Sequence, residues 1–252
     1  MNRRTIGAVS ALVLATALPA LANDQGLAGR VEKRLEKAGL FAQGDIRVTA
    51  DGDRAVLDGA VLTVRAQREA EKVARKETKQ VENRLRVVPE QDRSDAQLTK
   101  AVRDTILRST HYGVFDAVGA TVEDGVLTLD GSVYRPYTRT DIVDRVARVE
   151  GLRGLRDRVT VQSVSQFDDR LRRQLYVQIY GERFTHFANP ANPPVRIVVD
   201  RGRVTLTGSV PSNVDRVMLG HIARDTMAFK VDNLLQVDSE RSKEERRSGS
   251  SD

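Results

Sequence analysis

The sequence has 252 residues, a formal net charge of +6 and no cysteine. The lack of cysteine excludes disulfides, thiolate metal sites, a cysteine nucleophile and a lipid attached to an N-terminal cysteine. The excess of positive charge favours acidic partners, and removal of Arg3 and Arg4 would still leave the chain basic.

The N-terminus has the three parts of a secretory signal. Arg3 and Arg4 precede an apolar stretch at 6–18, and Pro-Ala-Leu-Ala follows at 19–22. The apolar stretch is shorter than the roughly 20 residues that a transmembrane helix needs, and small residues end it. We therefore predict a signal peptide over residues 1–22 and export to the periplasm. An uncleaved anchor and a twin-arginine export route are the alternatives.

The rest of the chain repeats one pattern three times. In each copy a glycine follows a leucine by two residues and precedes a valine by two, and about 25 residues later a second apolar block contains an Asn or Asp at its third position. The three glycines are Gly59, Gly131 and Gly208, and the second blocks lie at 81–87, 155–161 and 231–237. Two matched blocks at near-constant separation indicate three divergent copies of one module.

Each copy opens with a helix, because apolar residues four apart line one helix face. These residues are Leu27, Val31 and Leu35, then Leu98, Val102 and Ile106, then Leu171, Leu175 and Ile179. Ser94 and Gln97 have the spacing of a capping box, which predicts that the second of these helices begins near Ser94.

Two strands follow each first helix. Alternation predicts strands at 46–50 and 195–199, and Asp-Gly or Arg-Gly turns lead into the next strand. A charged second helix then returns the chain to a third strand. We place these second helices at 63–80, 138–149 and 212–227.

The predicted fold class is therefore α+β. It consists of three tandem small αββαβ modules, each a three-stranded mixed sheet packed on two helices. The modules are placed at residues 26–90, 94–164 and 167–239, and a charged, disordered tail at 240–252. Gly59, Gly131 and Gly208 are interpreted as structural turn residues at the strand-to-helix junctions, where a positive φ or a close backbone approach is commonly needed.

The repeated motif resembles the BON domain, named for bacterial OsmY and nodulation. The motif is D-G-x-V-x-L-x-G-x-V, a charged helix and G-V-x-x-V-x-N-x-L-x-V, and the second copy matches it most fully, at 124–133 and 151–161. Glu77 and Met227 replace Gly151 in the other two copies, where we expect a reshaped helix end. The resemblance implies a periplasmic or surface protein that binds phospholipid membranes or other envelope components, with roles in osmotic stress or envelope integrity. It implies no catalysis.

The residues themselves point away from an enzyme. His111, His186 and His221 lie in different copies and lack the H-x-x-x-H spacing that places two metal ligands on one helix face. The paired acids at 123–124 and 168–169 fit a turn and a helix start. We therefore predict a protein that is not an enzyme and has no cofactor and no metal.

Aromatic residues are scarce, yet they gather after the first helices. They are Phe41, Tyr112, Phe115, Tyr176, Tyr180, Phe184 and Phe187. One ring per copy, such as Phe41 or Phe115, is expected to plug the open end of its own core. In the third copy basic residues accompany the rings, a mixture that suits a membrane interface as well as a core. The candidate lipid contacts are Arg172, Arg173, Tyr176, Tyr180, Arg183, Phe184 and Phe187.

These observations together predict a non-enzymatic periplasmic protein that binds anionic phospholipid by peripheral association. Because export takes the chain away from the chromosome, nucleic acid is not an expected partner. A scaffold that recognises an envelope protein or peptidoglycan is the alternative, and the sequence leaves the oligomeric state open.

Overall fold

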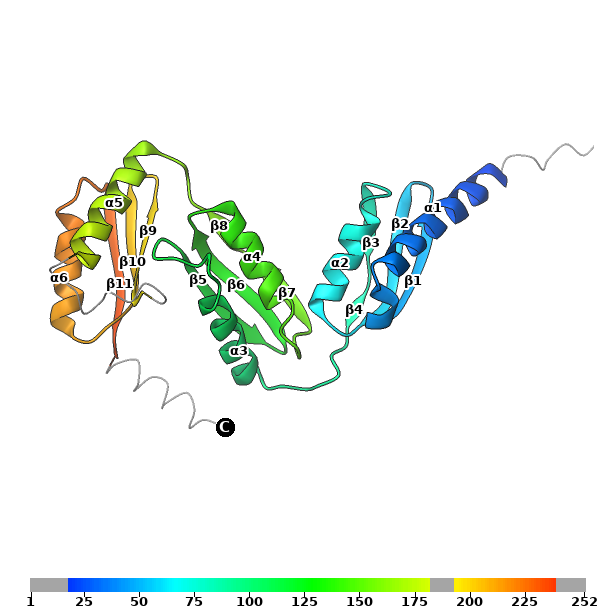
Figure 1. Ribbon diagram of the computed structural model, residues 1–252, viewed down its shortest axis with the longest axis horizontal. Coiled ribbons are helices and arrows are strands. Elements are labelled where there is room, and N and C mark those ends of the chain that lie inside the picture. Colours follow the sequence, from blue (N-terminus) through cyan, green and yellow to red (C-terminus); the bar gives the residue numbers. More distant parts are fainter. Residues whose placement is uncertain (1–17, 182–192, 239–252) are drawn as a thin grey trace, which may run out of the picture. The chain divides into compact units, whose positions relative to one another are not determined.

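A computed structural model describes residues 18–181 and 193–238 (Figure 1). The chain forms two compact units, Met1–Val88 and Pro89–Asp252. The first unit holds one αββαβ module and the second holds two, so the predicted fold class is confirmed. Most of the predicted signal peptide and the whole predicted tail lie outside the described residues.

The first module consists of seven elements. They are α1 (Leu18–Lys37), the 3₁₀ helix η1 (Leu40–Gln43), β1 (Gly44–Asp51), β2 (Arg54–Val61), α2 (Val64–Ala74), β3 (Gln80–Asn83) and β4 (Arg86–Val87). The sheet order is β1-β2-β3, and β4 extends the pairing of β3 along β2.

The second and third modules repeat this plan. The second contains α3 (Asp95–Leu107), β5 (Ala117–Glu123), β6 (Val126–Val133), α4 (Pro136–Val146), β7 (Gly154–Asp157) and β8 (Thr160–Val161). The third contains α5 (Gln166–Tyr180), β9 (Val195–Asp200), β10 (Arg203–Val210), α6 (Asn213–Arg224) and β11 (Lys230–Val237).

The second strand of every module is the central strand of its sheet. It pairs antiparallel with the first strand across a two-residue turn and parallel with the last strand. A parallel neighbour needs a crossover connection, and α2, α4 and α6 supply it. Leu57, Leu129 and Leu206 point from the three central strands into the cores and are fully buried. Each sheet thus hides one face under its two helices.

The start of α3 confirms the predicted capping box. Ser94 Oγ accepts from the backbone N–H of Gln97 at 3.3 Å, and Gln97 Oε1 accepts from the N–H of Ser94 at 3.2 Å. Because these bonds satisfy amides that have no partner within the helix, they fix the first residue of α3.

The predicted ends of the second helices were wrong. They end at Ala74, Val146 and Arg224, several residues before the predicted positions. Gln80, predicted as the last helical residue, instead opens β3 and pairs with Arg54. The parallel strand must begin level with the hairpin turn, and that requirement shortens the helix.

The last strand is broken in the first two modules. The side chain of Asn83 accepts from the backbone N–H of Leu85 at 3.1 Å, and that of Asp157 accepts from Val159 at 3.0 Å. Such local side-chain bonds compete with the strand ladder, so β3 and β7 each stop there and resume as β4 and β8. In the third module Asn233 makes a longer bond of 3.3 Å to Leu235, and β11 is continuous.

The three repeated glycines lie inside the central strands, two residues before their ends, and not at the strand-to-helix junctions. Gly59, Gly131 and Gly208 have φ values of 122°, 114° and 110°. A Cβ atom at these positions would lie 2.0 to 2.1 Å from a backbone carbonyl oxygen of the neighbouring segment. The close approach of these two backbone segments therefore requires glycine.

Candidate functional site

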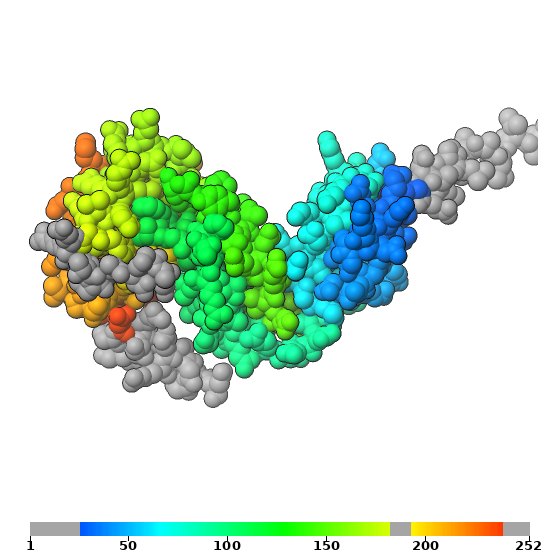
Figure 2. Space-filling model, viewed as in Figure 1, coloured from blue at the N-terminus to red at the C-terminus, as the bar shows by residue number. Residues whose placement is uncertain are grey.

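The second and third modules meet in a junction built from the loop after α3. The carbonyl oxygen of Val114 accepts from the N–H of Ile197 at 2.8 Å, which ties this loop to the edge strand β9. Val114 and Phe115 also pack against the apolar core of the third module. Phe115 was expected to plug its own core, and this contact corrects that expectation. Figure 2 shows the side chains of the two modules, in green and in yellow to orange, in contact.

Arg172 lies at the centre of this junction. Its side chain is 3% exposed and donates to Asp169 at 2.7 Å, to Gln162 Oε1 at 3.1 Å and to the carbonyl oxygen of Val199. The guanidinium also lies 4.4 Å from the centroid of the Tyr134 ring, a cation–π contact with the second module. The prediction that Arg172 contacts lipid was therefore wrong, because its guanidinium is buried and its two terminal nitrogens donate within the protein, although Nε has no partner among the described residues.

The other predicted contacts are divided between surface and core. Arg173 is exposed on α5, and Tyr176 is half exposed beside the junction, with its ring centroid 6.1 Å from that of Phe115. Tyr180 is half-buried. Its hydroxyl donates to the carbonyl oxygen of Val195 and accepts from the N–H of the same residue at 3.1 Å. Burial raises the pKa of Tyr180 to about 12. The rings of Tyr176 and Tyr180 stack with their centroids 5.5 Å apart. Three further candidates, Arg183, Phe184 and Phe187, lie outside the described residues.

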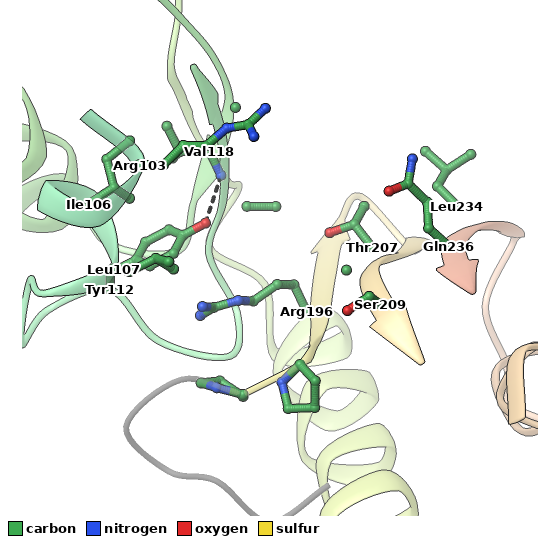
Figure 3. A pocket seen from close by; sticks show the side chains of 15 residues that line it. Arg103, Ile106, Leu107, Tyr112, Val118, Arg196, Thr207, Ser209, Leu234 and Gln236 are labelled. Carbon is green, nitrogen blue, oxygen red and sulfur yellow. Dashed lines mark hydrogen bonds between the residues drawn. The ribbon is translucent and has the colours of Figure 1, made fainter. Parts of the chain in front are cut away.

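A groove of about 630 Å³ lies beside the junction (Figure 3). The outward face of the third sheet supplies Thr207, Ser209, Leu234 and Gln236, and the end of α3 supplies Arg103, Ile106 and Leu107. Among the described residues, the lining consists of basic, hydroxyl, amide and apolar side chains, without a carboxylate or a histidine. The arginines, hydroxyl groups and amide of the lining can therefore bind polar or acidic groups.

Arg196 and Tyr112 close one side of the groove (Figure 3). The guanidinium of Arg196 lies 4.4 Å from the centroid of the Tyr112 ring and donates to the carbonyl oxygen of Gly113 at 2.8 Å. The hydroxyl of Tyr112 accepts from the N–H of Val118 at 3.0 Å, and burial raises the pKa of Tyr112 above its ordinary value. Both side chains thus serve the junction as well as the groove.

Neither a metal site nor a membrane-spanning helix is found in residues 18–181 and 193–238. In these ranges no three or more His, Asp or Glu side chains gather in a way that could hold a metal ion. Among the same residues, no helix has both the length and the apolar character needed to cross a membrane.

The family follows from the repeated modules. The profile of the BON domain matches residues 23–89, 94–163 and 185–239, which together make up more than half of the chain. The chain belongs to the BON domain family. The threefold resemblance predicted from the sequence is thereby confirmed. BON domains are non-catalytic binding domains, and BON-domain proteins are found in the cell envelope or periplasm.

Comparison with solved structures finds low similarity to CdsD, a structural protein of the type III secretion system of Chlamydia trachomatis. One structure, of its C-terminal domain, has 16% identity and a TM-score of 0.25, and covers 84% of this chain and 96% of that chain. Another has 13% identity and a TM-score of 0.25, with 88% and 97% coverage. At these TM-scores the likeness supports no inference about function. The comparison with curated proteins found no match.

One exposed surface was missed by the sequence reasoning. Met227 and Phe229, in the loop between α6 and β11, are 78% and 79% exposed. An alignment of the three copies on Asn83, Asp157 and Asn233 could have revealed this surface. It places polar residues or glycine in the other two copies at the positions of Met227 and Phe229. The segment between the second helix and the last strand also differs among the modules, as expected. Gly151 has a φ of 95°, whereas neither Glu77 nor Met227 has a positive φ.

Proposed function

We propose that this BON-domain protein is a non-enzymatic periplasmic protein that binds the surface of anionic phospholipid membranes and supports envelope integrity or the response to osmotic stress. The outer face of α5 carries the proposal. Arg170, Arg173 and Val177 are exposed there, Val177 by 62%, and the half-exposed ring of Tyr176 lies between this face and the junction. Basic and aromatic residues on one helix face suit the boundary between head groups and acyl chains.

Helix α2 of the first module supports the same function. Lys72 of α2 forms an ion pair with Glu69, and Arg75, directly after the helix, forms one with Glu71. Arg65, Arg68 and two lysines beyond the helix end, Lys76 and Lys79, are exposed and form no ion pair within the described residues. Each basic residue near an anionic bilayer contributes about 1 kcal/mol to binding.

Vesicle flotation with the full secreted chain tests the function. The protein is expected to float with vesicles that contain phosphatidylglycerol at low salt, and to be released at high salt because ions screen the attraction. Vesicles of phosphatidylcholine alone serve as the control. Absence of flotation with anionic vesicles at low salt would overturn the proposal.

The groove between the second and third modules favours a second candidate, a scaffold that binds an envelope protein or peptidoglycan. Leu234 is exposed on its floor, and Arg103 adds a positive charge to its wall. Pull-down from an envelope extract with the wild-type chain and with Leu234→Glu tests this candidate. An envelope component that the wild type retains and the variant loses would favour the scaffold.

A further inference from the structure

Four apolar residues gather at the end of the third module where α5 begins. Val164, Met227 and Phe229 are 92%, 78% and 79% exposed, and Phe167 is half-buried with its ring stacked on Phe229 at 5.2 Å between centroids. Val164 follows Ser163, whose hydroxyl accepts from the N–H of Arg201 in the β9–β10 turn. The start of α5, this turn and the α6–β11 loop lie at the same end (Figure 1). We refer to Val164, Phe167, Met227 and Phe229 as the apolar tip.

The protein holds this tip in place. The N–H of Phe229 donates to the carbonyl oxygen of Gly202 at 2.8 Å, and the Phe229 ring lies against the turn. A Cβ atom at Gly202 would lie 2.5 Å from that ring. The buried carboxylate of Asp168 fixes the turn by accepting from the N–H groups of Arg201 and Gly202, at 3.0 and 2.7 Å. The exposed ring therefore stands on a rigid base.

The other two modules show that the fold does not need apolar residues here. The residue before the last strand is Lys79 in the first module and Arg153 in the second, where the third has Phe229. The N–H of Arg153 makes the same 2.8 Å bond to the turn, with the carbonyl of Gly125. Two residues earlier, Met227 stands where the other modules have Glu77 and Gly151. Among the described residues, the third module alone places two large apolar side chains in water at this end, which is typical of an interaction surface.

The charges around the tip are mainly positive. Arg170, Arg201 and Arg203 are exposed and form no ion pair within the described part of the chain. Lys230 pairs with Asp232 at 2.8 Å. Asp225 at the end of α6 contributes one exposed carboxylate, and Asp200 at the end of β9 contributes a half-buried one. In the second module both residues before Gly125 are acidic, Glu123 and Asp124, whereas the third module has Asp200 and Arg201 before Gly202. Apolar side chains rimmed by arginines complement an anionic lipid surface.

We infer that the third module docks on anionic bilayers by its apolar tip, with Met227 and Phe229 inserted among the acyl chains and Arg170, Arg201 and Arg203 at the level of the head groups. This inference rests on the proposed function and specifies the part of the chain that penetrates the membrane. It places Phe229 deeper in the bilayer than any residue of the outer face of α5.

A tryptophan reporter tests the depth directly, because the chain contains no tryptophan. The full chain with Phe229→Trp is mixed with phosphatidylglycerol vesicles that carry brominated acyl chains. Its fluorescence is expected to shift to shorter wavelengths and to be quenched. Tyr137→Trp, at an exposed position of α4 in the second module, is the matched control and is expected to keep its emission.

A charge-neutral double variant tests the contribution to binding. Met227→Glu with Phe229→Arg introduces residues that the first and second modules already carry at these positions, and it leaves the net charge unchanged. Electrostatic attraction is thus kept while the apolar contact is lost. Burial of a large apolar side chain is worth about tenfold or more in affinity, so we expect vesicle partitioning to weaken about a hundredfold. Thermal unfolding is measured alongside, to show that the variant is folded.

The outcomes separate this inference from the proposed function. If the wild type does not float with anionic vesicles, the proposed function fails and the docking mode fails with it. If the wild type floats but the double variant floats equally well and the introduced tryptophan is not quenched, the membrane function stands and the tip is not the site of insertion. Weakened flotation together with quenching supports the tip.

Discussion

The guanidinium of Arg172, on the first helix of the third module, lies 4.4 Å from the centroid of the Tyr134 ring in the second module. This contact and the bond from Arg172 to Gln162, which follows β8, link the two modules. Arg172→Ala is expected to lower the free energy of unfolding by about 2–3 kcal/mol, because the buried acceptors of Gln162 and Val199 lose a charged donor, whereas water can replace it at the partly exposed Asp169. Denaturant titration measures the change.

Arg173→Ala is the matched control for that prediction. Arg173 is the next residue of α5 but is exposed, so its removal is expected to change stability by no more than about 0.5 kcal/mol. Under the proposed function, Arg173→Ala is expected to weaken binding to anionic vesicles at low salt. Equal losses of stability in the two variants would contradict the assigned burial of Arg172.

Asp168 and Asp95 make the same contact in two environments. Each carboxylate accepts from both N–H groups of the hairpin turn in its own module, at 2.7 and 3.0 Å for Asp168 and at 2.8 Å twice for Asp95. Asp168 is fully buried whereas Asp95 is half-buried. Alanine is expected to cost about 3 kcal/mol at Asp168 and about 1 kcal/mol at Asp95, where water can replace the lost acceptor. Comparison of the two unfolding midpoints tests this difference, and a larger cost at Asp95 would refute it.

Gly208 is expected to tolerate no side chain. Its φ is 110° and a Cβ atom would lie 2.0 Å from the carbonyl oxygen of Pro194, so Gly208→Ala should destabilise the protein by more than about 2 kcal/mol. Gly29→Ala is the control, because Gly29 lies in α1 with open space around it. That change is expected to be neutral or to stabilise by up to about 1 kcal/mol. Calorimetric melting of both variants gives the comparison.

Asp200 provides a pH-dependent contribution to stability. The N–H of Ser163 donates to its carboxylate at 2.7 Å and holds the pKa of Asp200 below its ordinary value of 3.8. Because the folded pKa is lower than the unfolded pKa, the contribution is complete above the unfolded value and is lost as the pH falls through the folded value. The stability difference between the wild type and Asp200→Asn should therefore shrink below about pH 4. A carboxyl NMR titration that placed the pKa of Asp200 at or above 3.8 would rule this out.

Most of the fold could be predicted because it depends on local patterns. Leu57, Leu129 and Leu206 recur at one place in three copies, and all three are core residues. The capping box at Ser94 is a contact between residues three positions apart, so spacing alone reveals it. The helix ends were harder to predict, since the position of Gln80 depends on its pairing with a strand about 25 residues away.

The site was predicted less well, because a helix sequence does not tell which side of the helix another module covers. Arg172 and Arg173 are adjacent and chemically identical, yet one is enclosed and the other exposed. The difference arises from Tyr134 and Gln162, which the second module and its connection to the third bring to the helix. No spacing within α5 carries that information.

Periodicity and the near-constant separation of two matched blocks were enough to predict the three modules, their element order and their family. Which basic and aromatic side chains face water depends on tertiary packing. Exposure is a property of what packs against a residue, and for Arg172, Phe115 and Phe229 the deciding neighbours come from distant segments of the chain.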